Sequence, residues 1–261
     1  MKITVITPVY NGEDTITQCI ESVLNQTYSD VEYIIMDAVS KDKTLEIING
    51  FASKKIKLIS KKDKSSCDAI NNAISVATGN IVCFLCSDDM YADDQVLEKV
   101  AKVFESDQKT SIVYSDIIYV NRTDIRKVER YWKSSPFKLG LYRKGWLVPH
   151  TSLFIKRKAL LEHGSFNIEF GMAADYELSY RLLEKYRLKS VYIPQILVKM
   201  RSGGVSNSSI KNIYRSLKDC YKVLIYHKVK APILPIIATM FYRLNQIFIP
   251  LYVKKSVNVQ P

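Results

Sequence analysis

The chain has 261 residues, of which 47% are hydrophobic and 11% aromatic, so it carries enough apolar surface for a full core and is not an intrinsically disordered protein. Its formal charge of +12 is concentrated at one end, because from Arg181 onward there are fifteen Lys or Arg and only two acids. A basic tail of this kind suits anionic lipid, nucleic acid or a diphosphate-bearing substrate and excludes a uniformly basic protein; a merely solvated surface is the alternative.

The N-terminal residues 1–8 are too short and too interrupted for a signal peptide, and their apolar run predicts a first strand. Five cysteines scattered through apolar segments indicate reduced thiols and a cytoplasmic location. Cys83 and Cys86 form a C-x-x-C pair. Because positions three apart on a strand point to opposite faces, we do not expect a redox or zinc pair there.

The first half of the chain alternates between strand and helix patterns. Runs rich in β-branched residues predict strands at residues 3–7, 31–36, 56–60, 81–85 and 112–119. Apolar residues at helical spacing predict helices at residues 15–25, 44–51, 65–77 and 95–104. This rhythm predicts an α/β fold, with a mostly parallel twisted sheet and helices on both faces, in which ligands bind beyond the carboxyl ends of the strands.

The second half is less regular. Residues 121–145 are polar and aromatic and predict a hairpin and a short helix. Further strands are expected at residues 153–155, 191–193 and 196–200, and a helix at 174–186. After Gly203 and Gly204 the chain becomes basic and helical, so we divide it into a main domain at residues 1–207 and a C-terminal segment at residues 208–261.

Acidic residues directly follow the second and fourth strands. Asp37 is placed where a carboxylate accepts from a ribose hydroxyl or a base N–H; helix capping is the alternative, which Asp42 fits better because it precedes the next helix. Asp88 and Asp89 repel each other unless a cation compensates, and a hard divalent ion with oxygen ligands does so. An exposed acidic turn is the alternative there.

Two polar residues stand out in the second half. Asp175 lies near the start of a predicted helix, where the helix dipole favours the ionised form that a general base needs. An ordinary acid at a helix N-terminus fits the pattern equally well. His150 follows Pro149 in a polar loop, where a substrate contact and a structural role both remain open.

A series of motifs, in the correct order over about residues 1–207, resembles family 2 glycosyltransferases of the GT-A fold. In the first half the motifs are Thr7-Pro8-Val9-Tyr10-Asn11, the segment from Asp37 to Thr44, Asp68-Ala69-Ile70-Asn71-Asn72, and Phe84-Leu85-Cys86-Ser87-Asp88-Asp89. In the second half they are His150-Thr151, Ala174-Asp175-Tyr176-Glu177 and Met200-Arg201-Ser202-Gly203-Gly204. The later motifs are most similar to bacterial enzymes that build surface polysaccharides.

The resemblance implies an enzyme that moves a sugar from a nucleotide-diphosphate sugar, UDP-linked in the first instance, to an acceptor hydroxyl with inversion. It implies that the nucleotide sugar is bound by Thr7, Pro8, Tyr10, Asp37, Asp68, Ser87 and Asp88. It implies Mn²⁺ or Mg²⁺ at Asp88 and Asp89, and Asp175 as the catalytic base. Contacts to the acceptor, or a lid that continues to Ser206, are implied for His150, Met200, Arg201, Gly203 and Gly204.

Two positions depart from the family pattern. Cys86 stands where the first acid of the D-x-D motif belongs, and a thiol is a poor ligand for a hard ion, so the metal site has fewer carboxylates. Ala38 stands where many relatives have glycine, which removes backbone freedom from the turn after Asp37.

We therefore expect direct displacement. Asp175 removes the proton of the acceptor hydroxyl as it attacks the anomeric carbon, and the metal offsets charge on the leaving diphosphate. The alternatives are a nucleotidyltransferase, although no Gly-rich phosphate loop is present, and a nucleic-acid or anionic-membrane binding module. Nucleic-acid binding leaves Asp88 and Asp89 unexplained, so we expect no nucleic-acid partner.

The C-terminal segment predicts attachment to a membrane surface. Residues 231–253 are rich in large apolar side chains but are interrupted by Arg243, Asn245 and three prolines, so they do not predict a span. Cations flank them on both sides, which is typical of a helix that lies in the headgroup region. This places the protein at the inner face of the membrane beside a glycan or lipid-linked acceptor; a helix that packs back on the main domain is the alternative.

Overall fold

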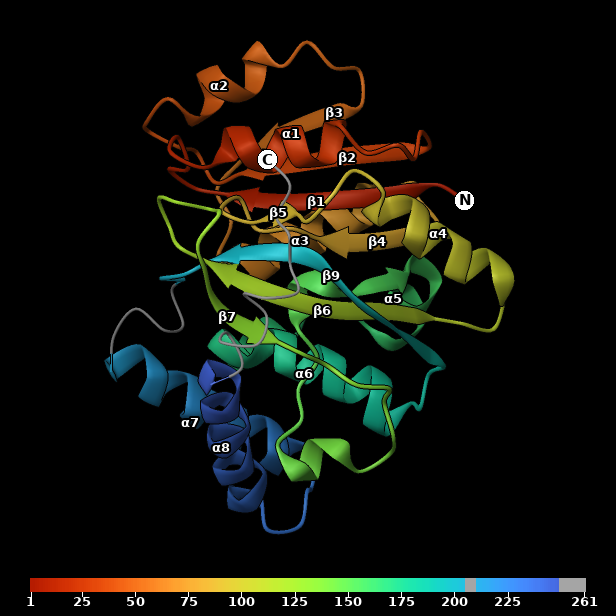
Figure 1. Ribbon diagram of the computed structural model, residues 1–261, viewed down its shortest axis with the longest axis vertical. Helices are drawn as coiled ribbons and strands as arrows, with labels where there is room; N and C mark the ends of the chain where they lie inside the picture. The colour runs from red at the N-terminus through yellow and green to blue at the C-terminus, as the bar shows by residue number, and fades with distance from the viewer. Residues whose placement is uncertain (205–209, 249–261) are drawn as a thin grey trace.

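The computed structural model describes residues 1–204 and 210–248, and in these residues one large sheet is covered by helices (Figure 1). The strands are β1 (Ile3–Val9), β2 (Val31–Asp37), β3 (Ile56–Ser60), β4 (Ile81–Phe84), β5 (Met90–Tyr91), β6 (Ile112–Val120), β7 (Val128–Trp132), β8 (Phe154–Lys156) and β9 (Ser190–Arg201). The α-helices are α1 (Ile16–Leu24), α2 (Thr44–Gly50), α3 (Ser66–Val76), α4 (Val96–Ser106), α5 (Arg157–His163), α6 (Ala174–Tyr180), α7 (Ile210–Tyr226) and α8 (Ile233–Phe248). Short 3₁₀ helices are η1 (Leu141–Lys144), η2 (His150–Ser152) and η3 (Ile168–Ala173).

The strands are ordered β3-β2-β1-β4-β8-β6-β9-β5, and β7 pairs with β6. β3, β2, β1 and β4 are parallel, as expected, and β9 is parallel to β6. β8 runs antiparallel to both of its neighbours, β4 and β6. It therefore begins at the edge where β4 and β6 end, which brings His150, shortly before β8, to the carboxyl ends of the parallel strands.

All seven residues of β1 are buried, from Ile3 to Val9. Because successive side chains of a strand point to opposite faces, this burial means that both faces of the sheet are covered. The pattern explains why the strand is almost continuously apolar and why its first polar, exposed neighbours, Tyr10 and Asn11, come only after the strand ends. The predicted α/β fold is confirmed.

Most predicted elements are confirmed to within two residues, and the differences have physical reasons. The predicted helix over residues 174–186 is α6 followed by a wider π-type turn, Arg181–Lys185. The two short strands predicted near residues 191–200 are one strand, β9, whose pairing with β6 skips two positions between Ile193 and Ile196. Pro194 lies in that gap and has no N–H to donate to the ladder. The pattern did not predict α5 or β5.

The described part of the C-terminal segment packs on the rest of the protein. α7 lies against η3 and α6, and α8 lies against η1 and β7. Leu224, Val229 and Ile236 form an apolar cluster that Tyr176 and Tyr180 of α6 extend. The two helices stand together at the end of the molecule opposite β3 (Figure 1). Within residues 1–204 and 210–248, no helix is both long and apolar enough to span a membrane.

Candidate active site

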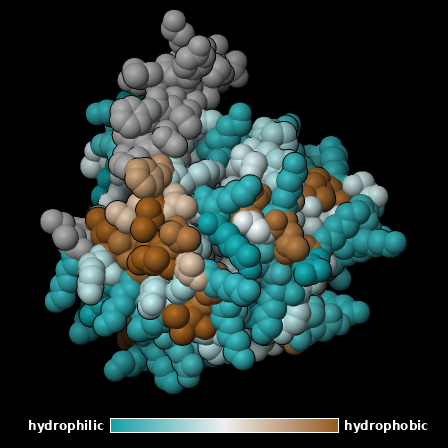
Figure 2. Space-filling model, turned by 90° about the horizontal axis from the view of Figure 1, so that it is seen from below, coloured by the Kyte–Doolittle hydropathy of each residue, from teal (hydrophilic) through white to brown (hydrophobic). Residues whose placement is uncertain are grey.

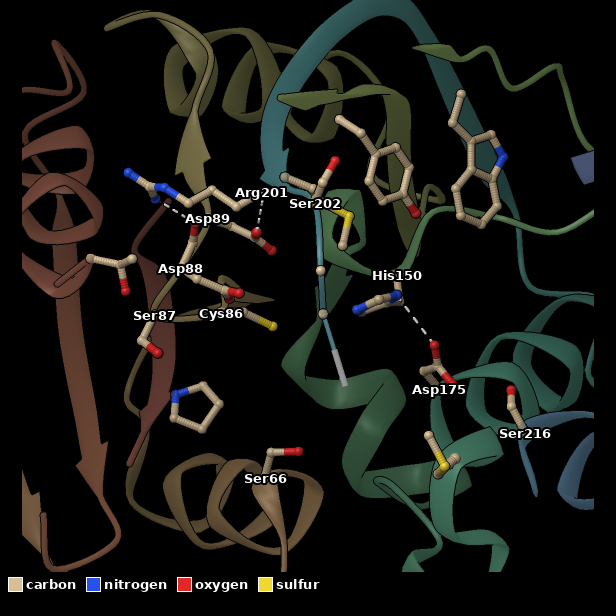
Figure 3. Close-up of a pocket in the computed structure, with 18 of the residues that line it drawn as sticks. Ser66, Cys86, Ser87, Asp88, Asp89, His150, Asp175, Arg201, Ser202 and Ser216 are labelled. Atoms are coloured by element: carbon tan, nitrogen blue, oxygen red, sulfur yellow. Dashed lines mark hydrogen bonds and ion pairs between the residues drawn. The ribbon is translucent and has the colours of Figure 1, made fainter. Parts of the chain in front are cut away.

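A cavity of about 770 Å³ lies beyond the carboxyl ends of β1 and β4 (Figure 3). Its walls come from several parts of the chain, which include the turn after β1, the start of α3, the loop after β4, the hairpin of β6 and β7, η2, the start of α6, the end of β9 and the inner side of α7. The residues that line it include Pro8, Tyr10, Cys86, Ser87, Asp88, Asp89, His150, Asp175, Ser202, Gly203, Gly204, Ser216 and Cys220.

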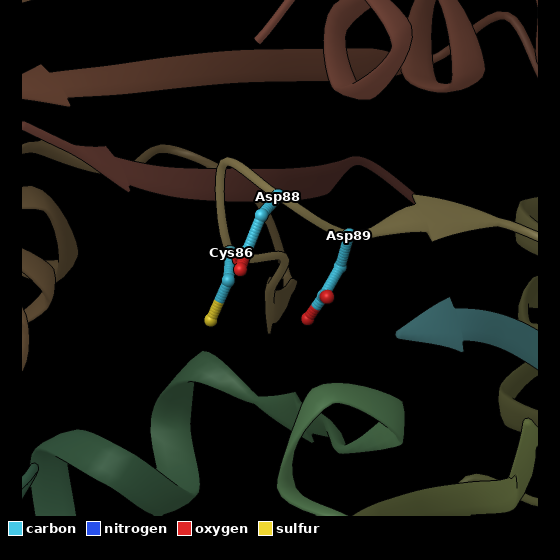
Figure 4. A group of neighbouring side chains, drawn as sticks. All are labelled: Cys86, Asp88 and Asp89. Carbon is cyan, nitrogen blue, oxygen red and sulfur yellow. The ribbon is translucent and has the colours of Figure 1, made fainter. Parts of the chain in front are cut away.

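An acidic cluster forms the end of the cavity next to β4. Candidate ligand atoms of Cys86, Asp88 and Asp89 lie within 4.8 Å of one another, and Figure 4 shows the three side chains pointing to the same side of the loop. The turn is closed by the Asp89 N–H, which donates to the Cys86 carbonyl over 3.0 Å. Sequence motifs predicted this convergence for the two aspartates.

The chemistry of the cluster fits a hard divalent cation. Asp89 is 1% exposed, and its Oδ2 is buried with no hydrogen-bond partner among the described residues. Burial, and then the neighbouring Asp88 carboxylate, raises the pKa of Asp89 well above its ordinary value. Burial and both aspartates likewise raise the pKa of the Cys86 thiol, which therefore stays neutral. Two carboxylate oxygens and a neutral thiol suit oxygen coordination of a divalent ion by Asp88 and Asp89.

The end of β9 braces this loop. The Arg201 backbone N–H donates to Asp89 Oδ1 over 3.2 Å, and its guanidinium donates to the Asp88 carbonyl and to the Gln18 side chain. Arg201 is buried, so in this structure it holds the acidic loop in place. Ser202, Gly203 and Gly204 line the cavity next to it, whereas the rest of the expected lid, Val205 and Ser206, lies outside the described residues.

A His–Asp pair faces the acidic cluster across the cavity (Figure 3). His150 Nδ1 lies 3.2 Å from Asp175 Oδ2, and both side chains are about one-third exposed. The other oxygen, Oδ1, accepts the N–H of Tyr176 over 2.8 Å. A carboxylate held from both sides and open to the cavity has the geometry of a general base.

A smaller side pocket of about 210 Å³ adjoins the cavity and shares Pro8, Tyr10 and Ser66 with it. Asp63 lies in its wall. The Asp63 side chain is 2% exposed, its Oδ1 accepts from Asn72 over 2.6 Å, and its Oδ2 is buried without a partner among the described residues. Sequence motifs did not single out Asp63, although it lies just past the carboxyl end of β3, at the same edge of the sheet where Asp37 ends β2.

Three residues expected at the nucleotide bond to other groups of the protein and do not line either cavity. The Thr7 hydroxyl is buried and bonded to Tyr33. The Asp37 carboxylate accepts from the N–H groups of Val39 and Ser40 and from the Ser60 hydroxyl. The Asp68 carboxylate accepts the Lys64 N–H at the start of α3. Asp42 lies one residue before Lys43, the N-cap of α2, and accepts the N–H of Thr44, the first residue of that helix.

The departure from the family pattern at Ala38 placed the restricted backbone at that residue, but the strained backbone lies one residue later. Val39, not Ala38, has the left-handed backbone conformation, with φ of 62°. A β-branched residue rarely adopts this conformation. The two backbone bonds to Asp37 hold the turn, so the Asp37 carboxylate shapes the edge of the side pocket, which Ala38 lines.

Several lining residues gave no signal in the sequence. Tyr119, Arg130 and Trp132 line the cavity from the β6–β7 hairpin, where the Arg130 guanidinium stacks on both rings. Ser216 and Cys220 line it from α7, and Figure 3 shows Ser216 on the far side of Asp175 from the acidic loop. Their contribution depends on how the hairpin and α7 pack, which no local pattern specifies.

Comparisons with known proteins identify the family of this chain. The profile of glycosyl transferase family 2 matches residues 4–164. A glycosyltransferase of PGL/p-HBAD biosynthesis from Mycobacterium tuberculosis is 26% identical over 79% of this chain and 79% of its own length. The Escherichia coli UDP-Glc:alpha-D-GlcNAc-diphosphoundecaprenol beta-1,3-glucosyltransferase WfgD is 27% identical over 95% of this chain and 92% of its own. A mannosyltransferase from Pyrobaculum calidifontis, solved with GDP-Man and Mn²⁺, has a TM-score of 0.66 at 18% identity, covering 100% of this chain and 76% of its own.

The chain belongs to glycosyl transferase family 2. It is an enzyme of glycan biosynthesis that transfers a sugar from a nucleotide-sugar donor, as the motifs predicted. The likeness to the solved mannosyltransferase shows that the fold is GT-A. The acidic cluster gives the enzyme a candidate site for a divalent metal.

Proposed function

We propose that the enzyme transfers its sugar with inversion in a single displacement. Asp88 and Asp89 would hold Mn²⁺ or Mg²⁺, which when bound would neutralise the donor diphosphate as it leaves. The single observation that carries the proposal is the placement of Asp175 across the cavity from the acidic loop (Figure 3). A base on that side removes the proton of an acceptor hydroxyl that approaches opposite the diphosphate.

His150 supports this role. Its ring lies against Asp175 and holds one carboxylate oxygen, while the Tyr176 N–H holds the other. The carboxylate is thereby oriented before the acceptor arrives, and little reorganisation is needed when the proton is transferred. Ser202 to Gly204 would close over the donor from the end of β9.

The side pocket favours a uracil base. Asp63 Oδ2 is a buried acceptor without a partner among the described residues, and uracil offers a ring N–H that fits it. Adenine and cytosine have no ring N–H on their pairing edge, whereas guanine has one. Pro8 and Tyr10 flank the same pocket and supply apolar surface for the base. We therefore propose a UDP-sugar as the donor.

The acceptor is proposed to be a lipid-linked glycan. The relative WfgD acts on a diphosphoundecaprenol-linked sugar, by its name, and it covers nearly the whole chain. The basic C-terminal segment at residues 208–261 would place the main domain, residues 1–207, at the inner face of the membrane, where such an acceptor is held.

The test is a screen of UDP-, GDP-, CDP- and ADP-sugars with Mn²⁺, followed by thermal shift and by release of nucleoside diphosphate. A matched donor stabilises the folded state by mass action, so UDP-sugars should raise the melting temperature most. Asp63→Asn should lower affinity for UDP and leave that for CDP and ADP, whose bases lack the ring N–H, unchanged. Release of pyrophosphate would instead identify a nucleotidyltransferase and overturn the proposal.

A further inference from the structure

The outward side of α8 is an exposed apolar stripe. Its large side chains are 44–64% exposed and recur at helical spacing on one face: Ile233, Leu234, Ile237, Met240 and Phe241. The opposite side of the helix is held against the protein, where Ile236 is buried and the Tyr242 hydroxyl donates to the Lys133 carbonyl. The stripe is therefore fixed in place and faces outward.

The neighbouring helix α7 continues this surface. Tyr214, Tyr221, Ile225 and Tyr226 are exposed along it. Figure 2, which views the molecule from the α7–α8 end, shows apolar side chains gathered between hydrophilic ones on this face. We call these nine residues of α7 and α8 the apolar face. Tyrosines at the margin of such a face are typical of proteins that meet the boundary between water and lipid.

The charges around the apolar face are almost all of one sign. Exposed cations follow one another along α7 and the turn after it: Lys211, Arg215, Lys218, Lys222, Lys228 and Lys230. The single acid in residues 210–248 is Asp219, which is buried, bonded to Lys222 and turned inward to the Met172 N–H. In the described part of the segment, no exposed carboxylate offsets the cations.

The combination of an apolar face with neighbouring cations indicates, by charge complementarity, what kind of partner binds there. A second copy docked through the same face would bring two rings of cations together, which repel. An anionic lipid surface satisfies both features, because its headgroups pair with the cations while the apolar side chains enter the headgroup region.

We propose that the apolar face of α7 and α8 is a docking surface for an anionic bilayer. The opposite side of α7 contributes Ser216 and Cys220 to the cavity, so a bound bilayer lies about one helix diameter, ~10 Å, from the acceptor end of the site. A lipid-linked acceptor then reaches Asp175 without leaving the membrane. This consequence rests on the proposed function. The docking itself does not depend on which sugar is transferred.

Flotation of the full chain tests the proposal. With phosphatidylcholine vesicles containing phosphatidylglycerol, the wild type should float at low salt, and less so at high salt. With phosphatidylcholine alone, binding should be at least about tenfold weaker. Two double variants, Ile237→Asp with Phe241→Asp and Lys218→Glu with Lys230→Glu, should each weaken binding to anionic vesicles by about tenfold or more.

Matched controls make the same chemical changes elsewhere. Leu161→Asp with Val76→Asp alters exposed apolar residues on α5 and α3, and Lys57→Glu with Lys109→Glu reverses exposed cations outside the segment. The apolar control should bind as the wild type does, and the cationic control should lose far less than Lys218→Glu with Lys230→Glu. Failure of the wild type to float, or unchanged flotation of both α7–α8 variants, overturns the proposal.

Light scattering distinguishes the other occupants. If the wild type is a dimer that does not bind vesicles, and Ile237→Asp with Phe241→Asp converts it to a monomer, the apolar face is a subunit interface. That result would overturn the lipid assignment. Release of UDP from a soluble donor should be unchanged in this variant. If the wild type floats but turns over no donor, the proposed function fails while the docking surface stands.

Discussion

At the scale of single residues, Asp88 is the clearest test of the metal. It is the more exposed of the two aspartates, whereas Asp89 is buried and braced by Arg201. Asp88→Ala should lower turnover by about 10²–10³-fold because several kcal/mol of charge stabilisation are lost. Thermal melting should show that the variant stays folded, and Asp94→Ala, at an exposed acid in the following loop, serves as the control. Full activity of wild-type enzyme in excess chelator would rule out the metal role.

The variant Asp175→Asn tests whether Asp175 is the general base. Asp175→Asn keeps the shape of the side chain and its bond from the Tyr176 N–H, so donor affinity should remain. Turnover should fall by ~10²–10⁴-fold, the usual contribution of a general base. Steady-state kinetics with the matched donor separate the two effects. A normal rate in this variant, or a product that retains the anomeric configuration of the donor, would contradict direct displacement.

At the scale of elements, Gly145 fixes how closely α8 approaches η1. A Cβ at this position would lie 2.3 Å from the backbone carbon of Ala238, and the residue also has a positive φ of 79°. Gly145→Ala should therefore cost about 1 kcal/mol of backbone strain plus about 1–3 kcal/mol of overpacking, measured by urea denaturation.

Gly140 supplies the matched control for this prediction. It has a similar φ of 89°, but a Cβ there meets no atom within 4 Å. Gly140→Ala should show only the cost of backbone strain. If the two variants are equally destabilised, the contact between α8 and η1 is looser than the structure indicates.

At the scale of the whole molecule, Glu177 ties the end of α7 to α6. It is 1% exposed and accepts from Arg181 of the turn after α6, over 2.8 Å, and it lies 3.0 Å from His227 Nε2 at the end of α7. Burial opposes ionisation, but the bonds from His227 and Arg181 outweigh it and lower the pKa of Glu177 below its ordinary value.

The lowered pKa gives the pH dependence its sign. The stabilisation from Glu177 is present above the ordinary carboxyl pKa and is lost as the pH falls through the lowered value. Glu177→Gln should lower the free energy of unfolding by about 2 kcal/mol at neutral pH and should flatten its decline in acid. Glu162→Gln, at an exposed ion pair on α5, should change neither. If the free energy of unfolding declines in acid equally for the wild type and for Glu177→Gln, Glu177 does not have this role.

Local pattern determined much of the fold. Apolar runs placed β1 to β4, because strands covered on both faces are nearly continuously apolar, and helical spacing placed α1 to α4, because the buried face of a helix repeats with a fixed period. The carboxyl ends of parallel strands share one edge, so Asp88 and Asp89 could be predicted to lie at a ligand site from strand order alone. Those inferences need only the period of each segment and the direction of its neighbours.

The tertiary structure alone decided which carboxylates line the two cavities. Asp37 ends β2 and Asp63 lies just past the end of β3, yet Asp37 turns inward to hold its own loop, whereas Asp63 lines the side pocket and keeps one buried oxygen without a partner among the described residues. It also decided that β8 is antiparallel and that Ser216 of α7 reaches the cavity. These outcomes depend on contacts between residues far apart in the chain. The direction of a single side chain is set by what packs around it and not by the spacing of its own segment.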